Sequence, residues 1–310
     1  MPQDILVVGS TALDSVETAH GRVVDAPGGS AFFFSAAAAR YAPVLVVGVV
    51  GDDFPLASLE PLRRLGVSLE GLEVVPGGRT FRWGGRYHDD MIGRDTLFTE
   101  LGVFQDFRPR IPAAARRRPV LFLANIQPRL QLDVLDQMEA PALVVTDTMN
   151  LWIHTALDDL RKVIARSHVL IVNDEEARQL TGLRSLLPAA RALREMGPRT
   201  VVVKKGEHGA LLLGEGGLFA APALPLERVL DPTGAGDTFA GGFVGSLAAE
   251  ARAADGRVDD AALRRAMIRG SALASFCVED FSFSRLAAVT DEDLRLRLAA
   301  FRDLTRYESA

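Results

Sequence analysis

The sequence has a single cysteine, Cys277, among 310 residues, and it contains no Asn-x-Ser/Thr acceptor for N-glycosylation. One cysteine excludes an internal disulfide, and neither feature suggests secretion. The N-terminus, MPQDILVVGS, has no positively charged region before its first apolar run, so no signal peptide is predicted. We therefore expect a cytoplasmic protein.

Long apolar runs and an excess of basic charge are also missing. Stretches such as residues 44–51 end at a charge, far short of the roughly 20 apolar residues that a membrane-spanning helix needs. The 35 basic residues are outnumbered by 40 acidic ones, so no surplus of positive charge is available for a nucleic-acid backbone. We expect neither a membrane nor a nucleic acid as a partner. The hydrophobic fraction of 48% is enough for a large buried core.

What the chain does contain is a series of short, continuously apolar runs, which are typical of strands buried on both faces of a parallel sheet. Strands are expected at residues 5–8, 44–50, 120–123, 142–145, 169–172 and 200–203. Helical periodicity occurs at residues 31–40, 55–65, 130–138, 156–165, 174–180 and 186–196. This alternation predicts an α/β fold with a mostly parallel central sheet, helices on both faces and ligands at the carboxyl ends of the strands.

Two segments and the C-terminal part depart from that alternation. Residues 13–26 and 75–103 alternate polar with apolar or aromatic residues, which indicates antiparallel strands. We expect them to form one small sheet, a lid beside the active-site edge of the large sheet, whose apolar face supplies a homodimer contact. Consecutive helices are expected at residues 237–251, 259–277 and 291–301. No Pro/Ser-rich linker divides the chain, so residues 1–310 are predicted to form a single domain with the lid inserted in it.

The strongest local signal is the run DPTGAGDTFAGGF at residues 231–243. Gly234 and Gly236 allow successive backbone amides to line a turn at the N-terminus of a helix, an arrangement that binds phosphoryl groups. Asp237 is then placed to take a proton from an attacking hydroxyl. The other interpretation is that Asp237 only caps the helix, and the motif alone leaves both open.

This run is similar to the carboxyl-terminal signature of the PfkB, or ribokinase-like, carbohydrate kinase family. Further family landmarks occur in the expected order, over residues 5 to 285 of the chain. They are Gly28-Gly29 before a helix, GDDF at residues 51–54, NDEE at residues 173–176 and KGEHG at residues 205–209. The resemblance implies a ribokinase-like fold, with Asp237 as general base and with Gly234 and the amides of Ala235, Gly236 and Asp237 forming an anion hole.

The resemblance also implies a nucleotide site that binds ATP. Lys205, Gly206 and Gly209 match the family's nucleotide-binding strand and turn, with Lys204 near the phosphates. Asn173 and Ser271 are assigned to the same nucleotide. The residues 205–209 taken alone favour an ordinary hairpin turn.

The resemblance further implies two metal sites. Asn173 and Glu176, three residues apart in an expected first helical turn, carry oxygens that suit the water shell of Mg²⁺, with Glu176 acting through water. The same pair can form a helix capping box, and the two roles are compatible. Asp231 matches a residue that helps to bind a monovalent cation such as K⁺, although residues 278–284, which would complete that site, depart from the family pattern.

For the acceptor, the resemblance assigns Asp14, Gly28 and Gly29 to the substrate, with Asn125 as a weaker candidate. The Asn that often follows the Gly-Gly pair in sugar kinases is replaced within residues 32–34, so the sugar specificity does not transfer.

A second departure lies at Asp147 and Asn150, which only approximate a family motif whose Arg is absent. Six aromatic residues offer two interpretations: a wall for a nucleobase or sugar ring, or helix core and lid packing, which is favoured. They are Phe32, Phe33, Phe34, Phe81, Trp83 and Tyr87.

The sequence thus predicts a kinase that transfers the γ-phosphoryl group of ATP to a hydroxyl of a sugar or sugar-like molecule. The alternatives are a nucleoside kinase of the same family and a catalytically silent sensor that binds a nucleotide or sugar. The intact Asp237, Asn173 and Glu176 argue against the sensor.

Overall fold

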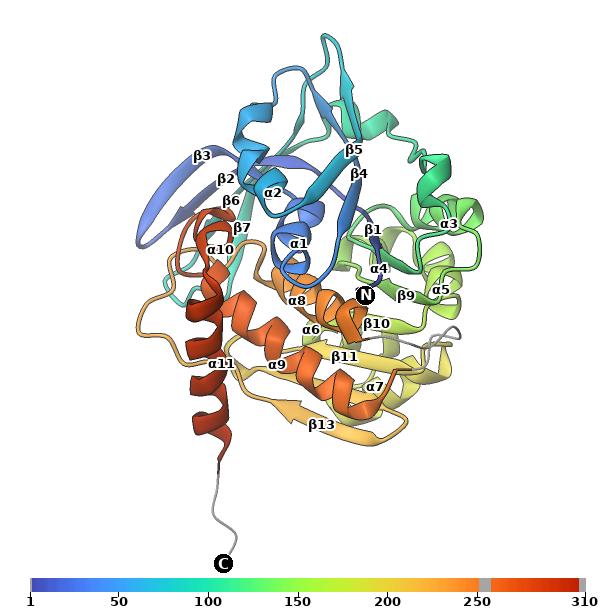
Figure 1. The fold of residues 1–310 in the computed structure, drawn as a ribbon, viewed down its shortest axis with the longest axis vertical. Coiled ribbons are helices and arrows are strands. Elements are labelled where there is room, and N and C mark those ends of the chain that lie inside the picture. The colour runs from blue at the N-terminus through green and yellow to red at the C-terminus, as the bar shows by residue number, and fades with distance from the viewer. Residues whose placement is uncertain (1, 251–257, 307–310) are drawn as a thin grey trace, which may run out of the picture.

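The computed structural model describes residues 2–250 and 258–306 (Figure 1). Its strands are β1 (Ile5–Val8), β2 (Ala12–Thr18), β3 (Gly21–Gly28), β4 (Val44–Gly51), β5 (Val67–Val75), β6 (Phe81–Tyr87), β7 (Arg94–Glu100), β8 (Val120–Leu123), β9 (Leu143–Thr146), β10 (Val169–Asn173), β11 (Thr200–Lys204), β12 (Ala210–Gly214) and β13 (Gly217–Ala221). Its α-helices are α1 (Ser30–Ala38), α2 (Glu60–Arg64), α3 (Pro128–Gln137), α4 (Asn150–Thr155), α5 (Leu157–Ala165), α6 (Asp174–Thr181), α7 (Leu186–Glu195), α8 (Ala235–Glu250), α9 (Asp260–Cys277), α10 (Ser284–Ala288) and α11 (Asp291–Thr305).

Nine strands form one large sheet in the order β13-β12-β11-β10-β9-β8-β1-β4-β5. Every neighbouring pair from β11 to β5 is parallel, whereas β12 and β13 join antiparallel at one edge. The predicted mostly parallel α/β sheet is therefore confirmed. Because consecutive parallel strands share a direction, their carboxyl ends lie along one edge of this sheet.

Successive residues of the central strands point to opposite faces, and both faces are covered. In β1, Ile5 and Val7 belong to an apolar cluster that includes residues of α1, α8 and α9. Leu6 and Val8 belong to a second cluster, which includes residues of α3. All four side chains have 0% exposure, which explains why the strand is continuously apolar. Figure 1 shows α8 and α9 crossing in front of the large sheet.

A separate sheet with the order β3-β2-β6-β7 contains both segments that were expected to form the lid. The pairs β2–β3 and β6–β7 are antiparallel hairpins, and β2 runs parallel to β6 where the hairpins meet. Figure 1 shows this sheet projecting beside α1 and α10. We call it the lid sheet.

Several predicted boundaries were wrong in detail. The helix expected from Asp237 begins at Ala235, and its expected end at residue 251 lies outside the described residues. The helix expected at residues 55–65 is a 3-10 turn, Leu56–Leu59, followed by the short α2. Strands β5 and β13 and helix α4 were not predicted. In the described part of the chain, no helix combines the length and apolar character required to cross a bilayer.

Candidate active site

Three neighbouring parallel strands deliver polar side chains to one edge of the large sheet. Asp147 directly follows β9, Asn173 ends β10 and Lys204 ends β11. Asn173 and Lys204 are register partners across the β10–β11 pair. Ligands of open α/β sheets bind at this edge, so the expected location of the site agrees with the fold.

The turn before α8 is held in one conformation by its own hydrogen bonds. The Thr233 amide donates to Asp231 Oδ1 (2.8 Å), and the Thr238 amide donates to the Gly234 carbonyl (2.8 Å). Gly234 has φ 75°, and a Cβ there would collide with the ring of Phe33, so only glycine fits.

The amides of this turn differ in what they can offer a ligand. The Ala235 amide already donates to the Pro232 carbonyl (3.2 Å). Those of Gly236 and Asp237 lie in the first turn of α8, where intrahelical acceptors are lacking. Together with the positive end of the helix dipole, they suit a phosphoryl group.

Asp237 is the acidic residue in the first turn of α8. Burial raises its pKa to about 7, repulsion from Asp147 adds to the shift, and Lys204 and Arg94 oppose it. A carboxyl that titrates near neutral pH is well matched to the task of a general base.

Lys204 is the cation at the centre of the site. Its Nζ lies 3.2 Å from Asp147 Oδ2, and a Cβ on Gly236 would lie 3.1 Å from the same nitrogen. Burial lowers the pKa of Lys204, but the carboxylates of Asp147, Glu176 and Asp237 outweigh it and raise the pKa above its usual value. Sequence reasoning missed that the Asp147 carboxylate raises the pKa of Asp237; the available signal was an acidic residue directly after a buried strand.

Asn173 and Glu176 form the predicted capping box at the start of α6. The Asn173 amide donates to Glu176 Oε2, and the Glu176 amide donates to Asn173 Oδ1, both at 2.8 Å. Glu176 is 5% exposed, and burial raises its pKa to about 7, with repulsion from Asp147 as the next contribution. A helix cap therefore holds an acidic side chain at the edge where Lys204 and Asp147 lie.

The donor set fits Mg²⁺ held through water better than a fully ligated metal. Among residues 2–250 and 258–306, no group of three or more His, Cys, Asp or Glu side chains is arranged to hold a metal ion. Mg²⁺ usually keeps several waters and is held by one or two carboxylates together with substrate phosphates. Glu176 and Asp147 provide carboxylates of that kind.

The KGEHG segment is a hairpin connection between β11 and β12, as its residues alone favoured. The Lys205 amide donates to the Gly209 carbonyl (2.7 Å). A Cβ on Gly209 would collide with the Ala221 carbonyl, so close packing against β13 already accounts for this glycine. A Cβ on Gly206 would meet open space, which leaves room for a ligand to approach.

Asp14 and the Gly28-Gly29 pair, which the family resemblance assigns to the acceptor, are in contact with one another. The Gly29 amide donates to Asp14 Oδ2 (3.3 Å), and a Cβ on Gly28 would collide with the same carboxylate. Burial raises the pKa of Asp14 to about 7, and Asp231 and Asp237 add to the shift. Asp14 thus faces the same site as the anion-hole turn.

Three further predicted positions have side chains that are hydrogen-bonded within the protein or largely buried. Asn125 accepts a hydrogen bond from Trp152 Nε1 (2.8 Å), so its side chain is already used within the protein. Asp231 is 1% exposed, and its carboxylate holds the turn by accepting the hydrogen bond from the Thr233 amide. Ser271 lies in α9 and is 8% exposed.

The aromatic residues divide between core and lid sheet. Phe32, Phe33 and Phe34 are at most 2% exposed and pack in the core, which confirms the core interpretation for them. Phe81 stacks on Phe104 at 5.4 Å, whereas Trp83 is the register partner of Asp14 in the lid sheet.

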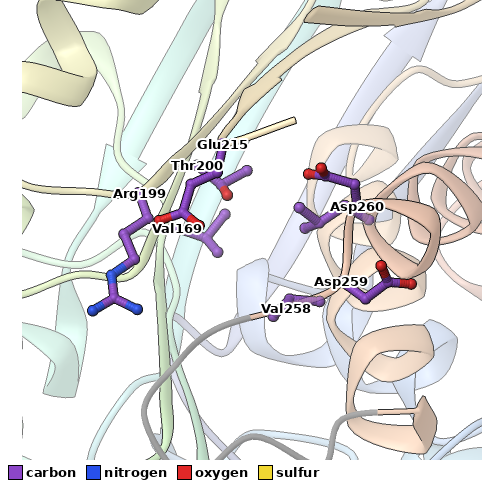
Figure 2. Close-up of a pocket in the computed structure, with 8 residues that line it drawn as sticks. Val169, Arg199, Thr200, Glu215, Val258, Asp259 and Asp260 are labelled. Carbon is purple, nitrogen blue, oxygen red and sulfur yellow. The ribbon is translucent and has the colours of Figure 1, made fainter. Parts of the chain in front are cut away.

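A cavity of about 310 Å³ lies at the other end of the parallel strands (Figure 2). It is lined where β10 and β11 begin, by Val169 and Thr200, and at the start of α9, by Asp259 and Asp260. None of the catalytic candidates borders it, so it is separate from the site described above.

Comparison with known proteins agrees with this arrangement. The family profile described as "pfkB family carbohydrate kinase" matches residues 132–286. A cytidine kinase of Thermococcus kodakarensis is 33% identical over 247 residues, which are 78% of this chain and 87% of that protein.

Two solved structures share the fold over almost the whole chain. The nucleoside kinase of Methanocaldococcus jannaschii has a TM-score of 0.75 at 20% identity and covers 96% of this chain and 98% of its own. A protein described as a ribokinase II of Escherichia coli, solved with ATP and Mg²⁺, has a TM-score of 0.78 at 16% identity and covers 96% and 99%. The chain belongs to the pfkB family of carbohydrate kinases, phosphotransferases whose acceptor is an alcohol group.

Proposed function

We propose that this chain is an ATP-dependent nucleoside kinase. One observation carries the choice of acceptor: Trp83 and Asp14 are register partners on adjacent strands, so an aromatic ring and a carboxylate share one face of the lid sheet. The carboxylate suits ribose hydroxyls, and the indole suits a stacked base. The 33% identity to a cytidine kinase supports the same class of acceptor.

The chain's own residues divide the work of phosphoryl transfer. Asp237 orients the acceptor hydroxyl and takes its proton, while the amides of Gly236 and Asp237 stabilise charge on the transferring group. Lys204 adds a positive charge beside Gly236. Lys205 and Gly206 border the nucleotide at the end of β11.

Bound Mg²⁺ would supply charge neutralisation at the phosphates, and Glu176, with Asn173 as its capping partner, would orient the metal's waters. We also propose that K⁺ binds beside the turn, with Asp231 as one ligand. A rate that is higher in potassium than in sodium chloride would support that second cation.

The lid sheet supplies the surface for a proposed homodimer. Val24 on β3 and Leu97 on β7 are 55% and 51% exposed, and Phe98 is 37% exposed. These exposed apolar side chains lie on the two edge strands of the lid sheet, and exposed apolar surface of this kind is typical of a contact surface.

An ADP-release assay over nucleosides and free sugars tests the choice of acceptor. Base stacking on an aromatic side chain is worth about 1–3 kcal/mol, so we expect kcat/KM for cytidine, uridine, adenosine or inosine to exceed that for ribose by at least about tenfold. Trp83→Leu should remove that advantage and leave the rate with ribose unchanged. Turnover of ribose, fructose or 2-dehydro-3-deoxygluconate in preference to every nucleoside would overturn the proposal.

A further inference from the structure

One face of the lid sheet is directed at the catalytic turn. Trp83, Gly85 and Tyr87 alternate on strand β6, so their side-chain positions share a face. A Cβ on Gly85 would collide with the Trp83 ring, so the indole lies flat along the strand. Asp14, the register partner of Trp83, belongs to the same face.

Tyr87 connects this face to the anion hole. Its side chain is buried at 6% exposure, and Thr233 Oγ1 donates a hydrogen bond to its hydroxyl (3.2 Å). Thr233 lies in the turn that precedes Asp237, and its amide donates a hydrogen bond to Asp231. The β6–β7 hairpin thus reaches the site of phosphoryl transfer.

Arg94, the first residue of β7, is the register partner of Tyr87 and so shares its face of the lid sheet. Its Cζ lies 5.6 Å from the centroid of the Trp83 ring. The neighbouring lid arginines are paired, Arg82 with Asp53 (2.7 Å) and Arg86 with Glu17 (3.1 Å). Within residues 2–250 and 258–306, no Asp or Glu carboxylate lies within 4.0 Å of the Arg94 guanidinium.

The charge of Arg94 acts on Asp237 and on Tyr87. It is one of the groups that oppose the rise in the pKa of Asp237, and it acts in the same direction on Tyr87. Lys204 also opposes that rise, but it is paired with Asp147. Arg94, in contrast, has no carboxylate partner within 4.0 Å in the described part of the chain.

We propose that Arg94 is a catalytic residue whose guanidinium contacts the phosphoryl group during its transfer and stabilises the charge on its oxygens. The bond from phosphorus to the leaving oxygen of ATP breaks, the bond to the acceptor oxygen forms, and the acceptor proton passes to Asp237. Arg94 neither gives nor takes a proton. The inference rests on the proposed transfer at Asp237 and not on the identity of the acceptor.

The position of Arg94 ties catalysis to the lid sheet. Arg94 lies opposite Tyr87, so the contact between Tyr87 and Thr233 fixes the distance between the guanidinium and the anion hole. An arginine carried on a separate sheet supplies its charge only while that sheet lies against the turn. This arrangement favours transfer to a bound acceptor over hydrolysis of ATP in an open site.

The test compares Arg94→Gln and Arg94→Lys with Arg86→Gln, which removes the same charge from the opposite face of the lid sheet. Loss of one stabilising donor typically costs about 10²–10³ in kcat, so we expect Arg94→Gln to fall about 100-fold or more with the acceptor KM nearly unchanged. Arg94→Lys should recover part of that loss, and Arg86→Gln should match the wild type.

Binding gives a readout independent of turnover. Calorimetry with Mg²⁺, the nucleoside and either ADP or ADP with aluminium fluoride should show that Arg94→Gln weakens the fluoride complex by about tenfold or more and leaves ADP affinity unchanged. An Arg94→Gln enzyme with normal kcat and a raised acceptor KM would overturn the inference and make Arg94 a substrate-binding residue. A wild-type enzyme that turns over no acceptor would overturn the proposed function and this inference together.

Discussion

The Lys204 ammonium lies 3.2 Å from the Asp147 carboxylate, and the two residues come from the ends of strands that β10 separates. The pair is buried, with side-chain exposures of 17% and 5%. Asp147 raises the pKa of Asp237 and Lys204 lowers it, so the pair tunes the proposed base in opposite senses.

Neutralising the two partners should therefore move the pH profile in opposite directions. In Asp147→Asn the acid limb of kcat/KM for the acceptor should shift to lower pH, because a repelling charge near Asp237 is lost. In Lys204→Met it should shift to higher pH, because an attracting charge is lost. Lys162→Met, at an exposed lysine of α5 that pairs with Asp159, is the control. Two shifts in the same direction would contradict this account of the Asp237 pKa.

Glu176→Gln tests the water-mediated Mg²⁺ site. Glutamine keeps the volume and can still accept the hydrogen bond from the Asn173 amide, so the helix cap and the fold should be retained. Changes in such outer positions typically cost about 10–100-fold in metal affinity, and we expect the Mg²⁺ concentration for half-maximal rate to rise accordingly. Glu175→Gln is the matched control, and an unmoved Mg²⁺ titration would reduce Glu176 to a helix cap.

The homodimer is tested by placing charge on the lid sheet. Leu97→Glu and Val24→Glu put a carboxylate on exposed apolar positions, and light scattering should show that they convert a wild-type dimer to a monomer. Leu218→Glu, at a position of β13 that is 47% exposed, should remain dimeric. A wild-type protein that stays monomeric at all concentrations would remove the dimer.

The difference in stability between Asp237→Asn and the wild type should change with pH in a definite direction. The folded pKa of Asp237 is raised to about 7 from the usual 3.8, so the stability linked to its protonation is fully present below 3.8 and is lost as the pH rises through 7. Asparagine carries no charge at any pH, so the melting temperature of the variant relative to wild type should increase between pH 4 and pH 8. Asp89→Asn, at the exposed lid tip, is the control. A variant that is equally destabilised at both pH values would indicate that Asp237 acts as a helix cap.

The central sheet and the helix cap at Asn173 could be predicted because each depends on local sequence. The continuous apolar runs reflect burial on both faces, and the reciprocal capping of Asn173 and Glu176 follows from a spacing of three residues. Strand β5 escaped prediction because this edge strand is half-exposed and mixes polar with apolar residues.

Contacts between distant segments could not be predicted in the same way. The sequence assigns Asp14 and Gly28 to the same ligand, but only the fold shows that the Asp14 carboxylate occupies the space a side chain at residue 28 would need. The contact between Tyr87 and Thr233 joins residues 146 positions apart, and no local pattern marks it.

The most direct test of the mechanism is kcat for Asp237→Asn, measured together with its affinity for ATP. General-base catalysis is typically worth about 10²–10⁴-fold, so we predict a fall of at least about a hundredfold in kcat. ATP affinity should be largely retained, because the backbone amides of the turn remain in place. An Asp237→Asn enzyme with wild-type kcat would contradict the account, since the proton of the acceptor would then need another base.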